Sequence, residues 1–190
     1  MKKIIQIAFE ALIVVALCSG CKKDENLVIT PPPVENESEV MTTFKLTFVD
    51  SEGISPMVTA EYRDPDRDGG NSAVRFDTIK LLSNKTYLVE VLILDETKNP
   101  VDTTSKEVLK EANDHLFFYT HSGVNETITI IDRDTHASTP LPIGLQTKWK
   151  TMAASTGTTS IVLRHQPGVK DGMYAPGETD IDLTFSTKIY

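Results

Sequence analysis

Cysteine is almost absent from this 190-residue chain, and its two cysteines, Cys18 and Cys21, both lie near the N-terminus. Residues 22–190 contain no thiol. Intrachain disulfides, cysteine-ligated zinc sites and cysteine nucleophiles are therefore excluded from the body of the protein. Its stability must come from a hydrophobic core, and residues 21–190 are enough for one domain.

The chain also lacks a basic block and the common enzyme motifs. Its 27 Asp and Glu outnumber its 19 Lys and Arg, and the formal net charge is −8. This acidity argues against nucleic acid as a partner and against direct docking on anionic lipid. The chain has no G-x-S-x-G elbow, H-E-x-x-H helix, P-loop or dinucleotide fingerprint. We therefore expect a protein that is not an enzyme.

A long hydrophobic run is missing as well. The apolar stretch that ends at residue 17 is shorter than the roughly 20 residues that a membrane-spanning helix needs, and it follows Lys2 and Lys3. A positive start followed by a short apolar run is the layout of a secretory signal peptide. We assign residues 1–20 to this signal peptide.

Ser19-Gly20, directly before Cys21, resembles a bacterial lipobox. The resemblance implies that Cys21 is diacylated, becomes the new N-terminus and is acylated there. Three acyl chains would hold the protein on a membrane far more firmly than one chain, which binds only marginally. Lys23-Asp24-Glu25 resembles the export tag of Bacteroidetes surface lipoproteins, so we expect an outer-membrane anchor exposed at the cell surface. The alternative for these charged residues is a solvated tether.

Residues 21–40 follow as a Pro-rich segment, in which Pro31-Pro32-Pro33 lies among acidic and polar residues. This composition predicts an extended, semi-rigid tether. From residue 41 on, apolar and polar residues alternate at period two in several short runs that are separated by turns rich in Gly, Asp, Asn and Pro. The spacing of Thr104 and Glu107 is that of a capping box and predicts one short helix over about 105–114.

We therefore predict one all-β domain over residues 41–190, an antiparallel β-sandwich with one short crossing helix. D-x-D pairs that begin at Asp64 and Asp132 each follow an alternating strand, which suggests two related halves. The alternation directs the following residues into the core: Phe44, Leu46, Phe48, Tyr62, Trp149, Ile161, Leu163, Leu183 and Phe185. In the last strand it places Asp180 and Asp182 on the opposite face.

The segment Asp64-Pro65-Asp66-Arg67-Asp68-Gly69 matches the first half of a calcium loop, with alternate carboxylates and a glycine in sixth place. Arg75 stands in twelfth place, where an EF-hand has a bidentate glutamate, so the segment is not an EF-hand. A looser Ca²⁺ site at Asp64, Asp66 and Asp68 is one hypothesis. The other is an acidic surface turn, whose Asp side chains cap backbone amides.

His115 and His165 are the second pair of metal candidates. A strand through 115–121 places His115 on the same face as Phe117, and His165 follows Leu163 at strand spacing. We expect the two histidines to meet at one edge of the core and to bind a transition metal ion as neutral imidazoles. The alternative is a pair of core or rim histidines with ordinary protein partners.

Two threonines lie in a short pattern that resembles the O-glycosylation acceptor of exported Bacteroidetes proteins. They are Thr78 in Asp77-Thr78-Ile79 and Thr103 in Asp102-Thr103-Thr104.

Several stretches resemble a family of uncharacterised outer-membrane or surface lipoproteins of the Bacteroidetes, of the flavobacterial type. They are residues 62–70, 84–87, 113–118, 163–168 and 176–185. The resemblance covers most of residues 40–190 and implies no established site. Some members are labelled as having a type 1 periplasmic-binding fold, but that fold needs alternating βα units, which this sequence does not predict.

These features predict a lipid-anchored binding or accessory module of the cell envelope, with a TonB-dependent transporter as its partner. Recognition would be carried by the loops 63–73, 132–143 and 164–178, because the sheets are committed to the core. An oxygen-ligated cation or a polar nutrient is the expected ligand. The alternatives are a structural envelope protein and a carbohydrate-active enzyme on a β-sandwich.

Overall fold

The computed structural model describes residues 39–67, 70–136 and 138–190, and these belong to one compact unit. The signal peptide, the lipidation site Cys21 and nearly all of the tether lie outside the described residues, as does Asp68. The described part of the chain has no helix with the length and hydropathy to cross a membrane.

Strands dominate the described chain, and one short helix interrupts them. The elements in chain order are β1 (Thr43–Asp50), β2 (Val58–Arg63), β3 (Arg75–Phe76), β4 (Ile79–Leu81), β5 (Thr86–Leu94), α1 (Thr104–Lys110), β6 (His115–Ser122), β7 (Glu126–Ile130), β8 (Gln146–Thr151), β9 (Ser155–His165) and β10 (Glu178–Ile189).

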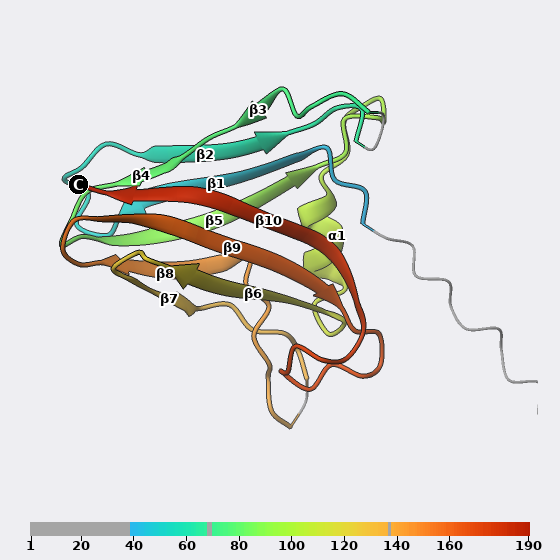
Figure 1. Ribbon diagram of the computed structural model, residues 1–190. Coiled ribbons are helices and arrows are strands. Elements are labelled where there is room, and N and C mark those ends of the chain that lie inside the picture. Colours follow the sequence, from blue (N-terminus) through green and yellow to red (C-terminus); the bar gives the residue numbers. More distant parts are fainter. Residues whose placement is uncertain (1–38, 68–69, 137) are drawn as a thin grey trace, which may run out of the picture. The chain divides into compact units, whose positions relative to one another are not determined.

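The strands form two sheets, which lie as two layers in Figure 1. The order is β3-β2-β1-β5-β8-β7 in the six-stranded sheet and β4-β10-β9-β6 in the four-stranded sheet. Every strand pair is antiparallel except β4 with β10. The predicted all-β, sandwich-like fold is therefore confirmed, and one short helix among these strands does not match alternating βα units.

The helix α1 connects β5 of the six-stranded sheet with β6 of the four-stranded sheet, as expected for a crossing helix. Its start differs from the capping-box prediction. Thr103 is the N-cap and makes no side-chain cap hydrogen bond. The hydroxyl of Thr104 instead donates to the carbonyl oxygen of Val40 at 2.9 Å. That hydrogen bond fastens the start of the domain to the helix.

The core lies between the two sheets, where Phe44 of β1 faces Phe185 of β10 with ring centroids 6.2 Å apart. All the predicted core residues are buried except Tyr62. Tyr62 is half-buried and packs on the core from β2, next to the two-residue edge strand β3. So short an edge strand leaves the ring partly open to solvent.

Both sheets draw strands from both sides of α1. The residues before α1 supply β4 to the four-stranded sheet, and those after it supply β7 and β8 to the six-stranded sheet. Two related halves would therefore be interleaved in the sandwich, and their relationship stays a prediction.

Candidate metal centre

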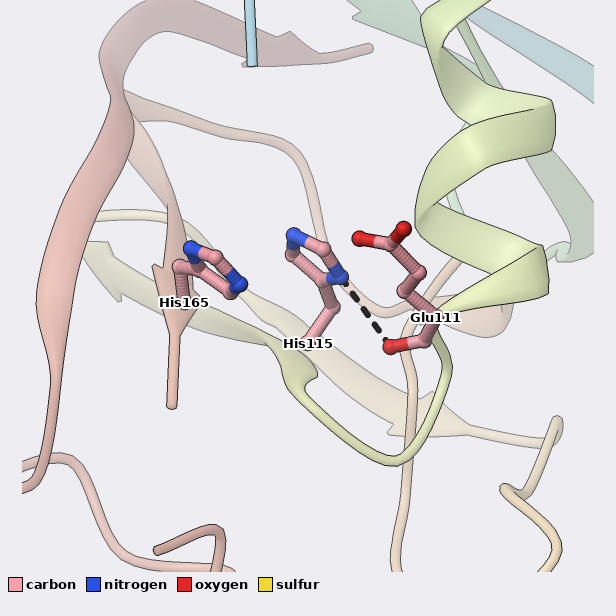
Figure 2. A group of neighbouring side chains, drawn as sticks. All are labelled: Glu111, His115 and His165. Carbon is pink, nitrogen blue, oxygen red and sulfur yellow. Dashed lines mark hydrogen bonds between the residues drawn. The ribbon is translucent and has the colours of Figure 1, made fainter. Parts of the chain in front are cut away.

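His115 and His165 lie directly opposite each other, because β6 pairs with β9 in a register that aligns these two residues. Their rings are parallel to within 5°, with centroids 4.5 Å apart, and Figure 2 shows them side by side. His115 is completely buried and His165 half-buried. The structure thus brings the two histidines together at the edge of the core, as the strand spacing indicated. Metal binding by this pair stays a prediction.

The hydrogen bonding of His115 determines which ring nitrogen carries the proton. Its Nδ1 lies 3.1 Å from the carbonyl oxygen of Glu111, drawn as the dashed line in Figure 2. A carbonyl oxygen can only accept, so Nδ1 carries the hydrogen and Nε2 presents a lone pair in the neutral ring. Burial lowers the pKa of His115, which favours this neutral form. Among the described residues, Nε2 has no hydrogen-bond partner.

Two buried carboxylates face that nitrogen. Nε2 of His115 lies 3.7 Å from Oδ2 of Asp180 and 3.8 Å from Oε1 of Glu39. The side chains of Asp180 and Glu39 are only 0% and 10% exposed. A third carboxylate belongs to Glu111, which offers a ligand atom within 4.8 Å of those of His115 and His165. Figure 2 shows this carboxylate beside the ring of His115.

Burial and the mutual repulsion of the acids disfavour negative charge on Glu39 in this cluster. A neutral Nε2 and an ionised carboxylate are both acceptors, so neither can donate a hydrogen bond to the other. Burial and the nearby acids Glu107, Asp180 and Glu111 raise the pKa of Glu39 to about 7. A positive ion among these atoms would compensate the buried negative charge.

Sequence reasoning missed Asp180 because of a β-bulge. Strict alternation along β10 placed Asp180 on the outer face with Asp182, and this prediction is wrong. The register between β10 and β9 shifts between Thr179 and Ile181, and the Asp180 side chain is completely buried beside His115. No residue type in this part of the sequence indicates that a β-bulge is present.

Glu39 and Glu111 were missed for other reasons. Glu39 was assigned to the tether, although its side chain is almost buried against the domain. Glu111 was assigned to the predicted helix, whereas α1 ends at Lys110 and Glu111 is its C-cap. Only the chain reversal from α1 into β6 brings Glu111 next to His115.

Two pockets adjoin the cluster and share Glu39. One, of about 210 Å³, is lined by Glu39, Met41, Tyr62, Asp64, Arg67 and Asp180. The other, of about 290 Å³, lies against α1 and includes Lys98, Glu107, Lys110 and Glu111. Both are lined mainly by polar residues, so water and small ions can approach the carboxylates from either side.

The acidic loop after β2 is divided between the interior and the surface. Asp64 is buried, accepts a hydrogen bond from the Tyr62 hydroxyl at 3.2 Å and lines the smaller pocket. Asp66 is exposed, and a hydrogen bond from the Asn71 side chain lowers its pKa. The proposed Ca²⁺ site at these residues stays a prediction. Asp64 nevertheless connects this loop to the pocket beside His115.

The second D-x-D pair holds loops together. Asp132 accepts hydrogen bonds from the backbone N–H groups of Gly144 and Gln146 at 2.8 and 3.0 Å. Asp134 accepts from the Leu141 N–H at 2.8 Å and from the Lys170 ammonium at 2.9 Å. These contacts explain the two carboxylates as fasteners of the loops 132–143 and 164–178.

The two glycosylation candidates differ in accessibility. Thr78 is exposed in the link between β3 and β4, whereas Thr103 is half-buried at the start of α1. Thr78 is therefore the more accessible acceptor, and modification of either residue stays a prediction.

We compared the chain with protein-family models, with curated proteins and with solved structures, and none of the three comparisons found a match. The resemblance to Bacteroidetes lipoproteins therefore stays a prediction.

Proposed function

We propose that this protein is a lipid-anchored lipoprotein of the cell envelope whose β-sandwich is a non-catalytic binding module for a small cationic or polar ligand. One observation carries the binding role. The buried lone pair of His115 Nε2 faces the carboxylates of Asp180 and Glu39 at 3.7 and 3.8 Å. Such a site favours a positively charged occupant.

The burial of His115 supports binding rather than catalysis. Its ring has no surface exposed to solvent, so an organic substrate has no direct access to Nε2. An ion held between the ring and the carboxylates needs no such access once it is bound. The adjoining polar pockets provide room for its approach.

The ligand is sought with the soluble chain that begins at Asn36, because the hydrophobic core lies entirely within the unit Asn36–Tyr190. Thermal unfolding is recorded with Ca²⁺, Zn²⁺, Cu²⁺, haem and oligosaccharides. A ligand at 100 times its dissociation constant stabilises the domain by about 2.7 kcal/mol, which raises the melting temperature by several degrees. A flat response to the whole panel would contradict the binding role and favour a structural envelope protein.

The anchor part of the proposal is supported by the signal-like residues 1–20 and by the lipobox resemblance before Cys21. It is tested by metabolic labelling of the full chain with a palmitate analogue, followed by membrane fractionation. Cys21→Ser should abolish the label and membrane association, whereas the matched variant Cys18→Ser should retain both. A labelled Cys21→Ser protein would contradict lipidation at this residue.

Location and partner form the last part of the proposal: the outer face of the outer membrane, beside a TonB-dependent transporter. The acidic export tag at residues 23–25 supports the location. Protease treatment of intact cells should remove the domain, and cross-linking in native membranes should recover such a transporter. Protection of the domain in intact cells would place it in the periplasm instead.

A further inference from the structure

We propose that the groove between the edge strands β6 and β7 binds an extended, apolar segment of a partner protein. The segment adds to β6 as a further strand and places one carboxylate on Arg133. This groove is separate from the cluster around His115, because neither His115 nor Glu39 lines it. The inference therefore goes beyond the proposed small ligand and gives the module a second, protein-binding surface.

The two sides of the sandwich end in strands of very different length. On one side the sheets end in β3 and β4, which have two and three residues. On the other side they end in β6, with eight residues, and β7, with five (Figure 1). Proteins usually protect an exposed edge by shortening the strand or by placing lysine or proline on it. β6 contains neither residue, so its edge can accept a further strand.

The backbone of β6 presents hydrogen-bonding groups to this edge. The Gln166 N–H donates to the carbonyl oxygen of Asp114 at 2.6 Å, so the even-numbered residues of β6 are the ones bonded to β9 in this antiparallel register. Phe117, Tyr119 and His121 therefore direct their N–H and C=O groups away from β9. In the part of the chain that the structure describes, the N–H groups of Tyr119 and His121 have no hydrogen-bond acceptor.

The protein already uses this edge for one strand-like contact. The Phe117 N–H donates to the carbonyl oxygen of Ile143 at 2.7 Å. The next residue, Gly144, lies so close to the strand that an added Cβ would be 2.5 Å from the Cβ of Phe117. Its carbonyl oxygen accepts from the Tyr119 hydroxyl at 2.5 Å. An extended backbone thus fits against β6 at Phe117, and a partner strand would continue the pairing at Tyr119.

A groove of about 390 Å³ runs along the same edge. Consecutive residues of both strands line it, 116–119 of β6 and 128–130 of β7, together with Arg133, Pro142 and Gly172. Ile128 and Ile130 are only half-buried there. Apolar side chains of a partner strand would be removed from water in this groove, which is the main favourable contribution to most protein–protein association.

Arg133 determines the charge of the groove. Among the described residues that line the groove it is the one charged residue, it is exposed, and it forms no ion pair with another described residue. The adjacent Asp132 already accepts hydrogen bonds from the N–H groups of Gly144 and Gln146. An unpaired arginine beside an apolar groove, in a chain with a formal net charge of −8, favours a partner that brings a carboxylate.

An extended peptide segment uses these features more completely than other occupants. Strand addition supplies main-chain hydrogen bonds for affinity, and alternate side chains then enter pockets and give specificity. A small apolar molecule would fill the groove but would leave the backbone groups of Tyr119 without partners. A second copy of the chain is less suitable, because the apolar side chains of its own β6 and β7 face its own interior.

Selection of peptides on the soluble chain that begins at Asn36 tests this inference, with random 12-residue sequences displayed on phage as the probe. We expect the selected sequences to combine alternating apolar residues with at least one Asp or Glu. The affinity of the tightest-binding sequence is then measured by fluorescence anisotropy of the labelled synthetic peptide. Arg133→Gln should weaken its binding by at least 5-fold. The matched control Arg67→Gln, an exposed arginine in the loop after β2, should leave the affinity unchanged.

Hydrogen exchange measured by NMR then locates the bound peptide. The peptide should slow exchange at the N–H groups of Tyr119 and His121, which point to the open edge. Exchange at Phe118 and Thr120, whose N–H groups are already bonded to β9, should change little. Protection at another surface, self-association of the chain through β6, or a selection without Arg133-dependent peptides would overturn the inference. None of these results would alter the outcome of the thermal panel with small ligands.

Discussion

Lys170 and Asp134 form an ion pair inside the protein. The ammonium nitrogen lies 2.9 Å from Oδ2 of Asp134, and neither side chain is exposed to solvent. The same ammonium donates to the carbonyl oxygen of Ala112 at 2.7 Å. One lysine therefore joins the loops 132–143 and 164–178 to the segment that follows α1.

Replacing this lysine should destabilise the domain strongly. Lys170→Met leaves the Asp134 carboxylate buried without its cation, and breaking a buried pair in this way costs about 3–5 kcal/mol. Arg75→Met is the control, because Arg75 pairs with Asp77 at 2.8 Å while its side chain is 50% exposed. An exposed pair contributes about 0–1 kcal/mol. Urea unfolding measures both values, and equal losses would contradict the burial of the Lys170 pair.

Asp134 should also make the protein sensitive to acid. Burial alone would raise its pKa, but Lys170 and backbone N–H donors lower the pKa to about 2. Because the folded pKa lies below the unfolded value of about 3.9, the contribution is complete above roughly pH 4 and is lost as the pH falls toward 2. The loss is on the order of 2 kcal/mol. Unfolding measured from pH 6 to pH 2 should show a shallower decline for Asp134→Asn than for the unaltered protein.

Glu126 should produce the opposite dependence on pH. Glu126 is buried, and the Thr159 hydroxyl donates a hydrogen bond to its Oε1 at 2.7 Å. Burial raises the pKa of the Glu126 carboxyl group. A carboxyl group with a raised folded pKa stabilises fully below its unfolded pKa, and this stability is lost as the pH rises through the folded value. Glu126→Gln should therefore gain stability over the unaltered protein between pH 4 and pH 8. Parallel stability curves of Glu126→Gln and the unaltered protein over this range would refute the prediction.

Two glycines with similar backbone angles should respond differently to alanine. Gly177 and Gly168 have φ of +75° and +67°, so alanine is strained at both, by about 1–2 kcal/mol. At Gly177 the added Cβ would also lie 2.0 Å from the carbonyl oxygen of His165, whereas at Gly168 it meets nothing within 4 Å. We expect Gly177→Ala to cost about 1–3 kcal/mol more than Gly168→Ala in urea unfolding. Similar costs would mean that β9 and β10 separate easily at this end.

Several features of this protein follow from the sequence because they depend on neighbouring residues. Alternation at period two identified the strands and directed Phe44 and Trp149 into the core, since side chains on a strand alternate between its two faces. The same periodicity placed His115 and His165 on core-facing positions at strand ends. The short helix was recognisable from local spacing, although Thr104 proved to bind Val40 instead of capping it.

The strand order was decided only in the tertiary structure. Placing β9 beside β6, which sets His115 against His165, depends on how two whole sheets bury their apolar faces. The parallel pairing of β4 with β10 likewise joins segments from opposite ends of the domain. Such long-range pairings leave no local pattern, because many strand orders satisfy the same alternation.

The positions of the two carboxylates beside His115 were also decided only in the tertiary structure. Asp180 turns inward through a β-bulge, and Glu39 reaches His115 from the segment before β1. In the sequence both carboxylates appear as ordinary polar residues. Their burial beside one ring nitrogen arises because backbone register and packing, which act across the whole sandwich, override the local preference of an acid for water.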